Sequence, residues 1–404
     1  MKNKTIPYLT GRLFDGISSG LFMMALPWVM LQTPNMGTFV ALVALACTVV
    51  SFLLTPLFST YIDRHSRKFL LILNQVIQSL TAGVVMFAYW YGWSSHWLLA
   101  GAQLFIWVSS NFAWAANNAF TQENYERDEY AAISSYQEIV MQSTTLGAGA
   151  LGVMLLQIWG MFEFALFAAV ASALAAFSYT LTPYRQQLRP KSRVPFFNQL
   201  LESKSIFSQS PKFYGFLMIS CLSYPILTFL GKLVPISFSE QGLSGQWYAA
   251  YNISFGLGSL LTGVLLQQIL AKFSLQNTIQ YAMFFVALML FGMSISSAPE
   301  LLIVFTFGFG FFNAINRIAR TNWMHHTVAI EQRGRVDGGL AMFSTLAQSL
   351  SYVLIALLSH YQHISMGFAI AAVVVLIASI MMLNLGRTLT GKSSLDMKGA
   401  TANS

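Results

Sequence analysis

Charged side chains are scarce in this sequence, and cysteines are almost absent. Of its 404 residues only 9% are Asp, Glu, Lys or Arg, whereas 55% are hydrophobic. A soluble domain needs more polar surface than this, so the composition excludes a water-soluble protein and indicates one that crosses a membrane several times. The two cysteines, Cys47 and Cys221, lie in apolar runs without metal-ligating neighbours. They are expected to be small packing residues with no role in a disulfide or a zinc site.

Motifs for catalysis and for nucleotide binding are missing as well. The histidines lie mostly in expected loops, and no Ser/His/Asp set or phosphate-binding loop occurs at membrane depth. Residues 147–152, Gly-Ala-Gly-Ala-Leu-Gly, match G-x-G-x-x-G, but they lie in an apolar run with no preceding strand. Small residues there allow close helix packing. We therefore expect no metal and no cofactor, and a membrane-embedded enzyme or receptor is only an alternative to the function inferred below.

About twelve apolar runs are long enough to span the hydrocarbon core of a bilayer. That core is about 30 Å thick and takes roughly 20 helical residues. The sequence therefore predicts an all-α integral membrane protein. Its helices are expected at residues 10–33, 37–61, 69–91, 97–120, 131–157, 161–182, 213–237, 246–270, 276–296, 300–322, 337–359 and 364–386.

Basic residues occur in alternate connections between these helices. The connections after the odd-numbered helices contain no Lys or Arg, for example residues 33–37, 92–96, 238–246 and 359–364. Basic connections stay on the cytoplasmic side, so both termini are expected there. The net charge of +8 follows from this topology and gives no reason to expect a nucleic-acid partner.

One long hydrophilic connection, Pro183–Lys212, divides the chain into two sets of six expected helices. An internal repeat supports the division, because Leu-Leu-Thr-Pro at 53–56 returns as Leu-Leu-Thr-Gly at 260–263. Two such halves with a site near the midplane are typical of secondary transporters. We expect an N-terminal bundle at 1–183, a cytoplasmic linker at 184–212, and a C-terminal bundle with a tail at 213–404.

A charged cluster interrupts the apolar sequence at 59–68, Ser-Thr-Tyr-Ile-Asp-Arg-His-Ser-Arg-Lys. Ions so close to hydrocarbon belong in a short connection at the membrane surface. The cluster resembles the loop between helices 2 and 3 of major facilitator superfamily transporters, Gly-x-x-x-Asp-Arg-x-Gly-Arg-Lys, with Ser59 and Ser66 at the glycine positions. A solvated basic loop that only follows the positive-inside rule is the alternative. The resemblance implies a gating role, with Asp63 capping the helix that begins near 337. The residues involved are Asp63, Arg64, Arg67, Lys68, Arg335 and Asp337.

Three segments narrow the resemblance. Residues 20–33 (Gly-Leu-Phe-Met-Met-Ala-Leu-Pro-Trp-Val-Met-Leu-Gln-Thr), the Asp63 loop and the Gly-Arg-Val step at 334–336 look like the drug/proton antiporter branch that contains the bacterial enterobactin and siderophore exporters. The likeness covers nearly all of residues 8–387. It implies twelve transmembrane helices in two pseudo-symmetric six-helix bundles, in the inner membrane of a bacterial cell. It also implies export driven by proton entry, and it does not identify the cargo.

Two carboxylates are candidates for the proton-coupling group. Asp15 follows Arg12 at i, i+3, a spacing that lets the two charges neutralise each other, so Asp15 is either a structural partner of Arg12 or a titrating acid. Glu138 is followed at helical spacing by Gln142 and Thr145, a polar stripe that should face the central cavity. Glu138 is placed slightly ahead of Asp15.

Polar and basic stripes on several helices are candidates for substrate binding. The stripe near 107–118 either packs or lines a cavity for a ring-bearing ligand. The basic face near 313–320 either reaches the headgroups or forms a cationic wall. Lys232 lies in an outer half, where topology requires no cation. The candidates are Arg12, Asn111, Trp114, Asn118, Gln142, Tyr224, Thr228, Lys232, Asn313, Arg317 and Arg320.

Cations therefore outnumber carboxylates in the expected transport path, which favours an anionic cargo. We expect proton-coupled export of a small anionic metabolite such as a siderophore. The alternatives are multidrug efflux of lipophilic or cationic compounds, and import. The expected partners are the small-molecule substrate, protons and membrane lipids. The chain is expected to act as a monomer, because each half supplies the other's interface.

Overall fold

The computed structural model describes most of the chain as helices. It describes residues 2–126, 159–184, 204–296, 298–328 and 330–401, together with 129, 133, 136, 137, 139–141, 143–145, 147, 148, 152, 155 and 158. These residues contain no strand. The helices are α1 (Lys2–Leu31), α2 (Gly37–Arg64), α3 (Arg67–Trp90), α4 (His96–Asn124), α6 (Met161–Leu181), α8 (Pro211–Ser220), α9 (Ser223–Glu240), α10 (Gly245–Leu270), α11 (Leu275–Ile295), α12 (Pro299–Thr327), α13 (Ile330–His360) and α14 (Met366–Thr401).

The predicted all-helical membrane fold is confirmed. In the part of the chain that the structure describes, eleven helical stretches are long and apolar enough to cross a membrane. α8 and α9 together form one of them, Pro211–Glu240. The helix expected at 131–157 falls largely outside the described residues, although those described between 133 and 158 are helical.

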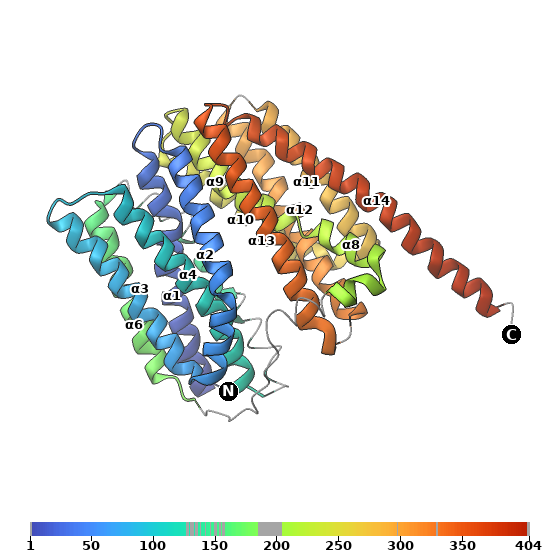
Figure 1. Cartoon of the computed structure of the whole chain (residues 1–404), viewed down its shortest axis with the longest axis horizontal. Helices are drawn as coiled ribbons and strands as arrows, with labels where there is room; N and C mark the ends of the chain where they lie inside the picture. Colours follow the sequence, from blue (N-terminus) through green and yellow to red (C-terminus); the bar gives the residue numbers. More distant parts are fainter. Residues whose placement is uncertain are drawn as a thin grey trace. The chain divides into compact units, whose positions relative to one another are not determined.

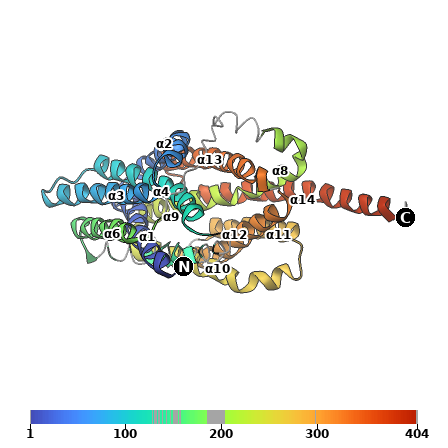
Figure 2. The ribbon, with the colours of Figure 1, turned by 90° about the horizontal axis from the view of Figure 1, so that it is seen from below.

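Two compact units divide the chain. The first contains Met1–Arg193 and Phe238–Ile253, and the second contains Val194–Ser237 and Ser254–Ser404. In the first unit α1 packs against both α4 and α6, and α3 packs along α6 (Figure 1). In the second unit α11 lies beside α12, as Figure 2 also shows. The placement of α1 among its neighbours is what builds the site described below.

Small residues hold α1 close to its neighbours. The hydroxyl of Ser18 lies 2.6 Å from that of Ser172 in α6 and donates to the carbonyl of Ala168 at 2.9 Å. A Cβ atom built on Gly20 would lie 2.9 Å from the Cβ of Ala148. Such contacts are typical of helix packing in membranes, where backbones approach closely through small side chains. They confirm that Ala148 packs tightly against a neighbouring helix.

Gly16 provides a test of this close packing. A Cβ atom at Gly16 would lie 2.5 Å from Oγ1 and 2.8 Å from Cβ of Thr144. We expect Gly16→Ala to lower the free energy of unfolding by about 1–3 kcal/mol, because overpacking forces the two backbones apart. The measurement is thermal unfolding in detergent. Gly101→Ala is the matched control, because a Cβ there meets nothing within 4 Å and alanine raises helix propensity. Equal melting temperatures for the two variants would contradict the close-packing account.

The span expected at 213–237 is confirmed as Pro211–Glu240, and the structure adds a short break within it. α8 ends at Ser220, and α9 begins at Ser223. Pro225 explains the break, because it has no N–H to donate and its ring clashes with the carbonyl four residues earlier, that of Cys221. Nη1 of Arg320 donates to the carbonyl of Ser220 at 2.7 Å and so satisfies one acceptor at the break.

Residues 238–253 contain the end of α9, the start of α10 and the turn between them, and they belong to the first unit. The hydroxyl of Ser239 donates to the carbonyl of Leu31, at the end of α1, at 2.5 Å. The rings of Trp28 and Tyr248 stack with centroids 5.4 Å apart, and both side chains are buried. The Ala-Leu-Pro-Trp stretch of α1 therefore ends in an aromatic contact with α10.

Candidate substrate pocket

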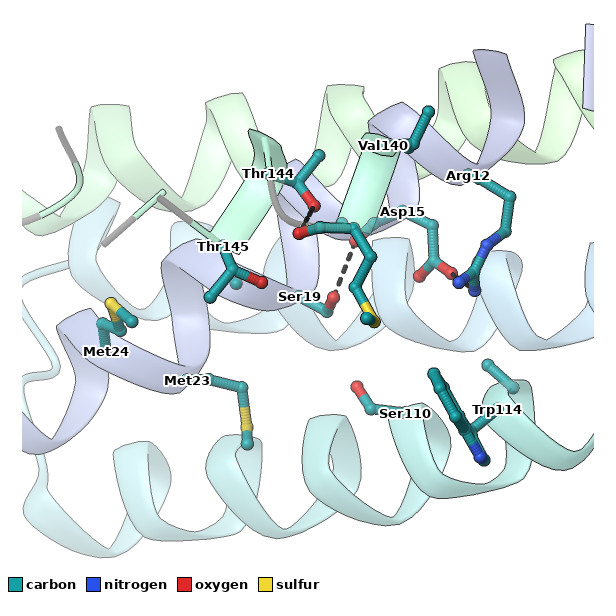
Figure 3. Close-up of a pocket in the computed structure, with 14 residues that line it drawn as sticks. Arg12, Asp15, Ser19, Met23, Met24, Ser110, Trp114, Val140, Thr144 and Thr145 are labelled. Atoms are coloured by element: carbon teal, nitrogen blue, oxygen red, sulfur yellow. Dashed lines mark hydrogen bonds and ion pairs between the residues drawn. The ribbon is translucent and has the colours of Figure 1, made fainter. Parts of the chain in front are cut away.

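A cavity of about 300 Å³ lies within the first unit (Figure 3). α1 supplies one wall and α4 another, and the described residues between 140 and 145 supply the rest. Its volume suits a small organic molecule or part of a larger one. It is lined by Arg12, Asp15, Gly16, Ser19, Gly20, Met23, Met24, Ser110, Ala113, Trp114, Val140, Met141, Thr144 and Thr145.

Arg12 and Asp15 form the charged part of the pocket. Nη1 of Arg12 lies 3.9 Å from Oδ2 of Asp15, and their side chains are 13% and 8% exposed. One helical turn separates them, so α1 alone sets this pairing. Nε of Arg12 is buried without a hydrogen-bond partner among the described residues. The long ion pair leaves both groups with unused hydrogen-bonding capacity towards a ligand.

Polar neighbours surround the carboxylate of Asp15 on the side of α3. Gln75 and Gln78 lie beside it. Gln78 is close to the carboxylate but forms no hydrogen bond of normal geometry with it. Both of its side-chain polar atoms therefore have no partner within the described residues. Tyr8 of α1 and Tyr179 of α6 interact with Asp15 electrostatically. An ionised carboxylate at this depth is expensive unless such groups stabilise it.

The remaining lining is largely apolar, and its methionine side chains are flexible and polarizable. Figure 3 shows Met23, Met24 and the Trp114 ring around the cavity. The Trp114 side chain is 54% exposed, so its ring face is available to a ligand. Methionine adapts its shape to a guest, and aromatic rings stack on other rings. The pocket thus combines one cation and one carboxylate with surfaces that suit a ring-bearing molecule.

The structure brings together only some of the predicted site residues of the first half. Arg12, Asp15 and Trp114 line one pocket, and their roles remain predictions. Asn111 and Asn118 lie exposed on α4 outside its lining, and Nδ2 of Asn111 donates to the carbonyl of Trp107 at 3.0 Å. Glu138 and Gln142 lie outside the described residues, so both remain predictions.

The predicted residues of the second half lie in the second unit. Lys232 and Asn313 are buried, and Oδ1 of Asn313 has no hydrogen-bond partner among the described residues. Thr228 donates to the carbonyl of Pro225 at 2.9 Å. Tyr224 and Arg317 are exposed. Their part in substrate binding remains a prediction.

Arg320 also has a structural role, which the sequence analysis did not predict. Besides the carbonyl at the end of α8, its Nη1 reaches Oδ1 of Asn316 at 3.2 Å and the hydroxyl of Ser223 at 3.4 Å. The guanidinium therefore joins α12 to the break between α8 and α9. An anionic ligand would have to compete with these contacts for Arg320.

The charged cluster at 59–68 contributes a buried ion pair. Nη1 of Arg67 lies 3.4 Å from Oε2 of Glu123 and donates to the carbonyl of Ala119 at 2.7 Å. The hydroxyl of Tyr184 donates to Glu123 at 2.7 Å. Lys68 donates to two carbonyls beside the end of α6, those of Thr180 and Thr182, at 2.8 Å each. Two of the predicted gating residues thus bind α4 and the end of α6 in this unit.

The other predicted gating residues are less informative. The side chains of Asp63 and Arg64 lie outside the described residues, and Arg335 and Asp337 are exposed at the start of α13. The gating role of the cluster remains a prediction. Sequence reasoning missed Glu123 and Tyr184, and it also missed the pocket residues Ser19 and Ser110.

A charged pocket among many membrane-spanning helices is typical of membrane transporters. The model of the Major Facilitator Superfamily matches residues 8–316, and the chain belongs to that family. No curated protein matches the sequence. The family establishes a transporter rather than an enzyme.

Solved transporter structures share the fold. A bacterial homologue of the iron transporter ferroportin, in an inward-facing state, matches with a TM-score of 0.75 and 16% identity over 95% of this chain and 99% of that one. A bacterial metal transporter matches with 0.70 and 14% over 95% and 98%. The nucleoside transporter NupG matches with 0.71 and 12% over 95% and 99%. At such identities the likeness concerns the fold alone.

Proposed function

We propose that the chain is a proton-coupled exporter of a small anionic metabolite, such as a siderophore, and that it works by alternating access. The supporting observation is the Arg12–Asp15 pair in a cavity of about 300 Å³. Arg12 binds the anionic part of the cargo, and Asp15 carries the proton. The protein acts as a monomer in the inner membrane of a bacterial cell, with both termini in the cytoplasm, and the 1–183 half rocks against the 213–404 half.

The balance of charge within the helices supports an anionic cargo. Away from the helix ends, the charged side chains in the described spans are Asp15 and four cations, namely Arg12, Lys232, Arg317 and Arg320. An excess of positive charge within the spans attracts an anion, and the attraction grows as the local dielectric constant falls. A carrier of cations would gain from the opposite balance.

Antiport requires that cargo and proton compete for the same group. An anion bound only to Arg12 would instead favour protonation of Asp15, because the anion and an ionised Asp15 carboxylate repel each other. Competition arises when the cargo also donates hydroxyl groups to the ionised carboxylate. Catechols and hydroxamates present such O–H donors next to oxygen acceptors, and both are siderophore groups. A proton arriving on Asp15 removes the acceptor and releases the cargo.

The gating cluster completes the proposed cycle. Asp63 caps the N-terminal end of α13 when the cytoplasmic side is closed, where its charge is stabilised by about 0.3–1 kcal/mol. Arg64, Arg335 and Asp337 act in the same closure. Closure then biases the transporter towards the outward-open state.

A multidrug exporter of lipophilic cations is the second candidate. The soft pocket walls formed by Met23, Met24 and Trp114 favour it, because such walls accept guests of varied shape. A cationic drug would have to displace Arg12 from Asp15 and would compete with the proton directly. The excess of positive charge within the spans opposes this candidate.

Deleting the gene in iron-starved native cells tests the proposed cargo. We expect the siderophore to disappear from the medium and to accumulate inside the cells, both measured by mass spectrometry. Complementation with the wild-type gene restores secretion, and complementation with an Arg12→Gln variant does not. Unchanged secretion, combined with loss of efflux of cationic dyes, would establish the second candidate instead.

A further inference from the structure

Four amide side chains of α3 and α4 are buried outside the pocket lining. Asn74, Gln75 and Gln78 of α3 and Gln103 of α4 are each at most 2% exposed. Asn74, Gln75 and Gln78 occupy positions i, i+1 and i+4, so one turn of α3 carries all three. None of the four lines the cavity described above. We call this set the amide seam.

The amide seam has unused donors and unused acceptors. Within the described residues, Nε2 and Oε1 of Gln78, Nδ2 of Asn74, and Oε1 of both Gln75 and Gln103 have no hydrogen-bond partner. Buried polar groups in membranes are normally paired, since hydrocarbon offers no partner. A ligand that both donates and accepts hydrogen bonds would pair these atoms, and water has that chemistry. A metal cation would satisfy the oxygens and leave the N–H groups of Gln78 and Asn74 unpaired.

The seam connects Asp15 to α4. Gln75 and Gln78 lie beside the carboxylate, and Oδ1 of Asn74 accepts from the hydroxyl of Ser109 in α4 at 2.6 Å. α3 and α4 run antiparallel because residues 91–95 join them directly. Gln78 is therefore displaced from Asn74 by about 6 Å along α3, towards the end that the 91–95 connection joins to α4. That connection contains no basic residue and faces outward in the proposed topology.

The groups that face Asp15 are consistent with proton binding at this position. Arg12 and Tyr8 face it from α1 and Tyr179 from α6, whereas α3 contributes only neutral amides. A cation in the seam would meet the charge of Arg12, whose Nη1 lies 3.9 Å from the carboxylate. A proton neutralises the carboxylate without adding a second ion beside Arg12.

We propose that the amide seam holds water molecules that deliver protons to Asp15, by a route separate from the cargo pocket. The inference rests on the proposed role of Asp15 in the function above. In the step, a proton passes from hydronium through these water molecules, and the Asp15 carboxylate accepts it to become a carboxylic acid. Arg12 keeps its charge, and no other bond forms or breaks. Gln75 and Gln78 are positioning residues, because they act through water.

Infrared difference spectroscopy on the purified full-length protein in lipid nanodiscs tests the route without any cargo. A carboxylic acid band that appears on acidification and is absent in Asp15→Asn reports the protonation of Asp15. After a pH jump, we expect Gln78→Leu to slow the appearance of this band by about tenfold or more, a change that corresponds to about 1.4 kcal/mol of barrier. Gln78→Ser keeps a polar group that can hold water, and it is expected to retain a rate near that of the wild type.

A matched control separates the route from a general effect of losing a buried amide. Gln280 is buried in the second unit, and its Nε2 donates to Ser379, so Gln280→Leu makes the same chemical change away from the seam. We expect no change in the Asp15 rate. An unchanged rate in Gln78→Leu, or an equally slow rate in Gln78→Ser, would contradict the proposed proton route. Removal of the band by sodium ions would also contradict it. A wild-type protein with no Asp15 band at any pH would instead refute the coupling role of Asp15 in the proposed function.

Discussion

Asp15→Asn is expected to reduce proton-driven transport to below about 1% of the wild-type rate while leaving the pocket intact. Asparagine has nearly the same shape as aspartate but binds and releases no proton at physiological pH. Groups that transfer protons typically contribute about 10²–10⁴-fold to a rate, so loss of the proposed coupling acid stops the coupled cycle. The measurement is cargo flux in proteoliposomes under an imposed pH gradient, with proton flux followed by an enclosed pH-sensitive dye.

The pH dependence of cargo binding shows how Asp15 acts. If the cargo donates hydroxyl groups to the ionised carboxylate, one proton competes with the cargo. Its dissociation constant then rises about tenfold for each pH unit below the titration of Asp15. In Asp15→Asn this dependence is expected to vanish. Binding that strengthens at acid pH would mean that anion and proton bind together, which contradicts antiport and supports symport.

Glu163→Gln is the matched control for both measurements. It makes the same change from acid to amide, but Glu163 is exposed in the first turn of α6. Its charge stabilises the helix N-terminus by about 0.3–1 kcal/mol, and the pocket does not include it. We expect wild-type flux and an unchanged pH profile. A loss of flux equal to that of Asp15→Asn would remove the special role of Asp15.

The helices could be predicted because their cause is local. Apolar runs of the necessary length identify the spans, and the scarcity of charge within them leaves few alternatives. The break between α8 and α9 was not predictable in this way, because Pro27 and Pro235 also lie inside apolar runs and do not interrupt α1 or α9. α1 begins at Lys2 and not near residue 10, because a helix continues past the apolar core when nothing in the sequence ends it.

The candidate site was predictable only where its geometry lies within one helix. Arg12 and Asp15 pair at i, i+3, which needs no knowledge of other helices. Spacing on α4 relates Asn111 to Trp114, but it does not tell which of them faces α1. Gln78 was missed because a neutral amide in an apolar run attracts less attention than a charge.

Long-range pairs need the fold. Glu123 and Arg67 are 56 residues apart, and nothing in either local sequence links them. Sequence resemblance assigns Arg67 to a gating loop, whereas the structure places its guanidinium in a buried ion pair with α4. The two roles are compatible, but the ion pair gives Arg67 a measurable effect on stability whatever the gate does.

Glu123→Leu is expected to destabilise the first unit by about 3–5 kcal/mol. The side chains of Arg67 and Glu123 are 5% and 4% exposed, so removal of the carboxylate leaves a buried and unpaired guanidinium. Tyr184 loses its acceptor at the same time. Burial and the hydrogen bond to Glu123 both raise the pKa of Tyr184, to about 12, so its phenol stays protonated and donates at physiological pH. The measurement is thermal unfolding in detergent.

The double variant Arg67→Met/Glu123→Leu separates the unpaired charge from the loss of contacts. Replacing both members of a buried pair by apolar residues is often neutral or stabilising, so the double variant is expected to recover most of the stability that Glu123→Leu loses. Glu126→Gln is the control, because it changes an exposed glutamate three residues further along the chain. A double variant as unstable as Glu123→Leu would show that the carboxylate acts mainly through Tyr184 and α4. The Arg67 charge would then have no special place in the stability of this unit.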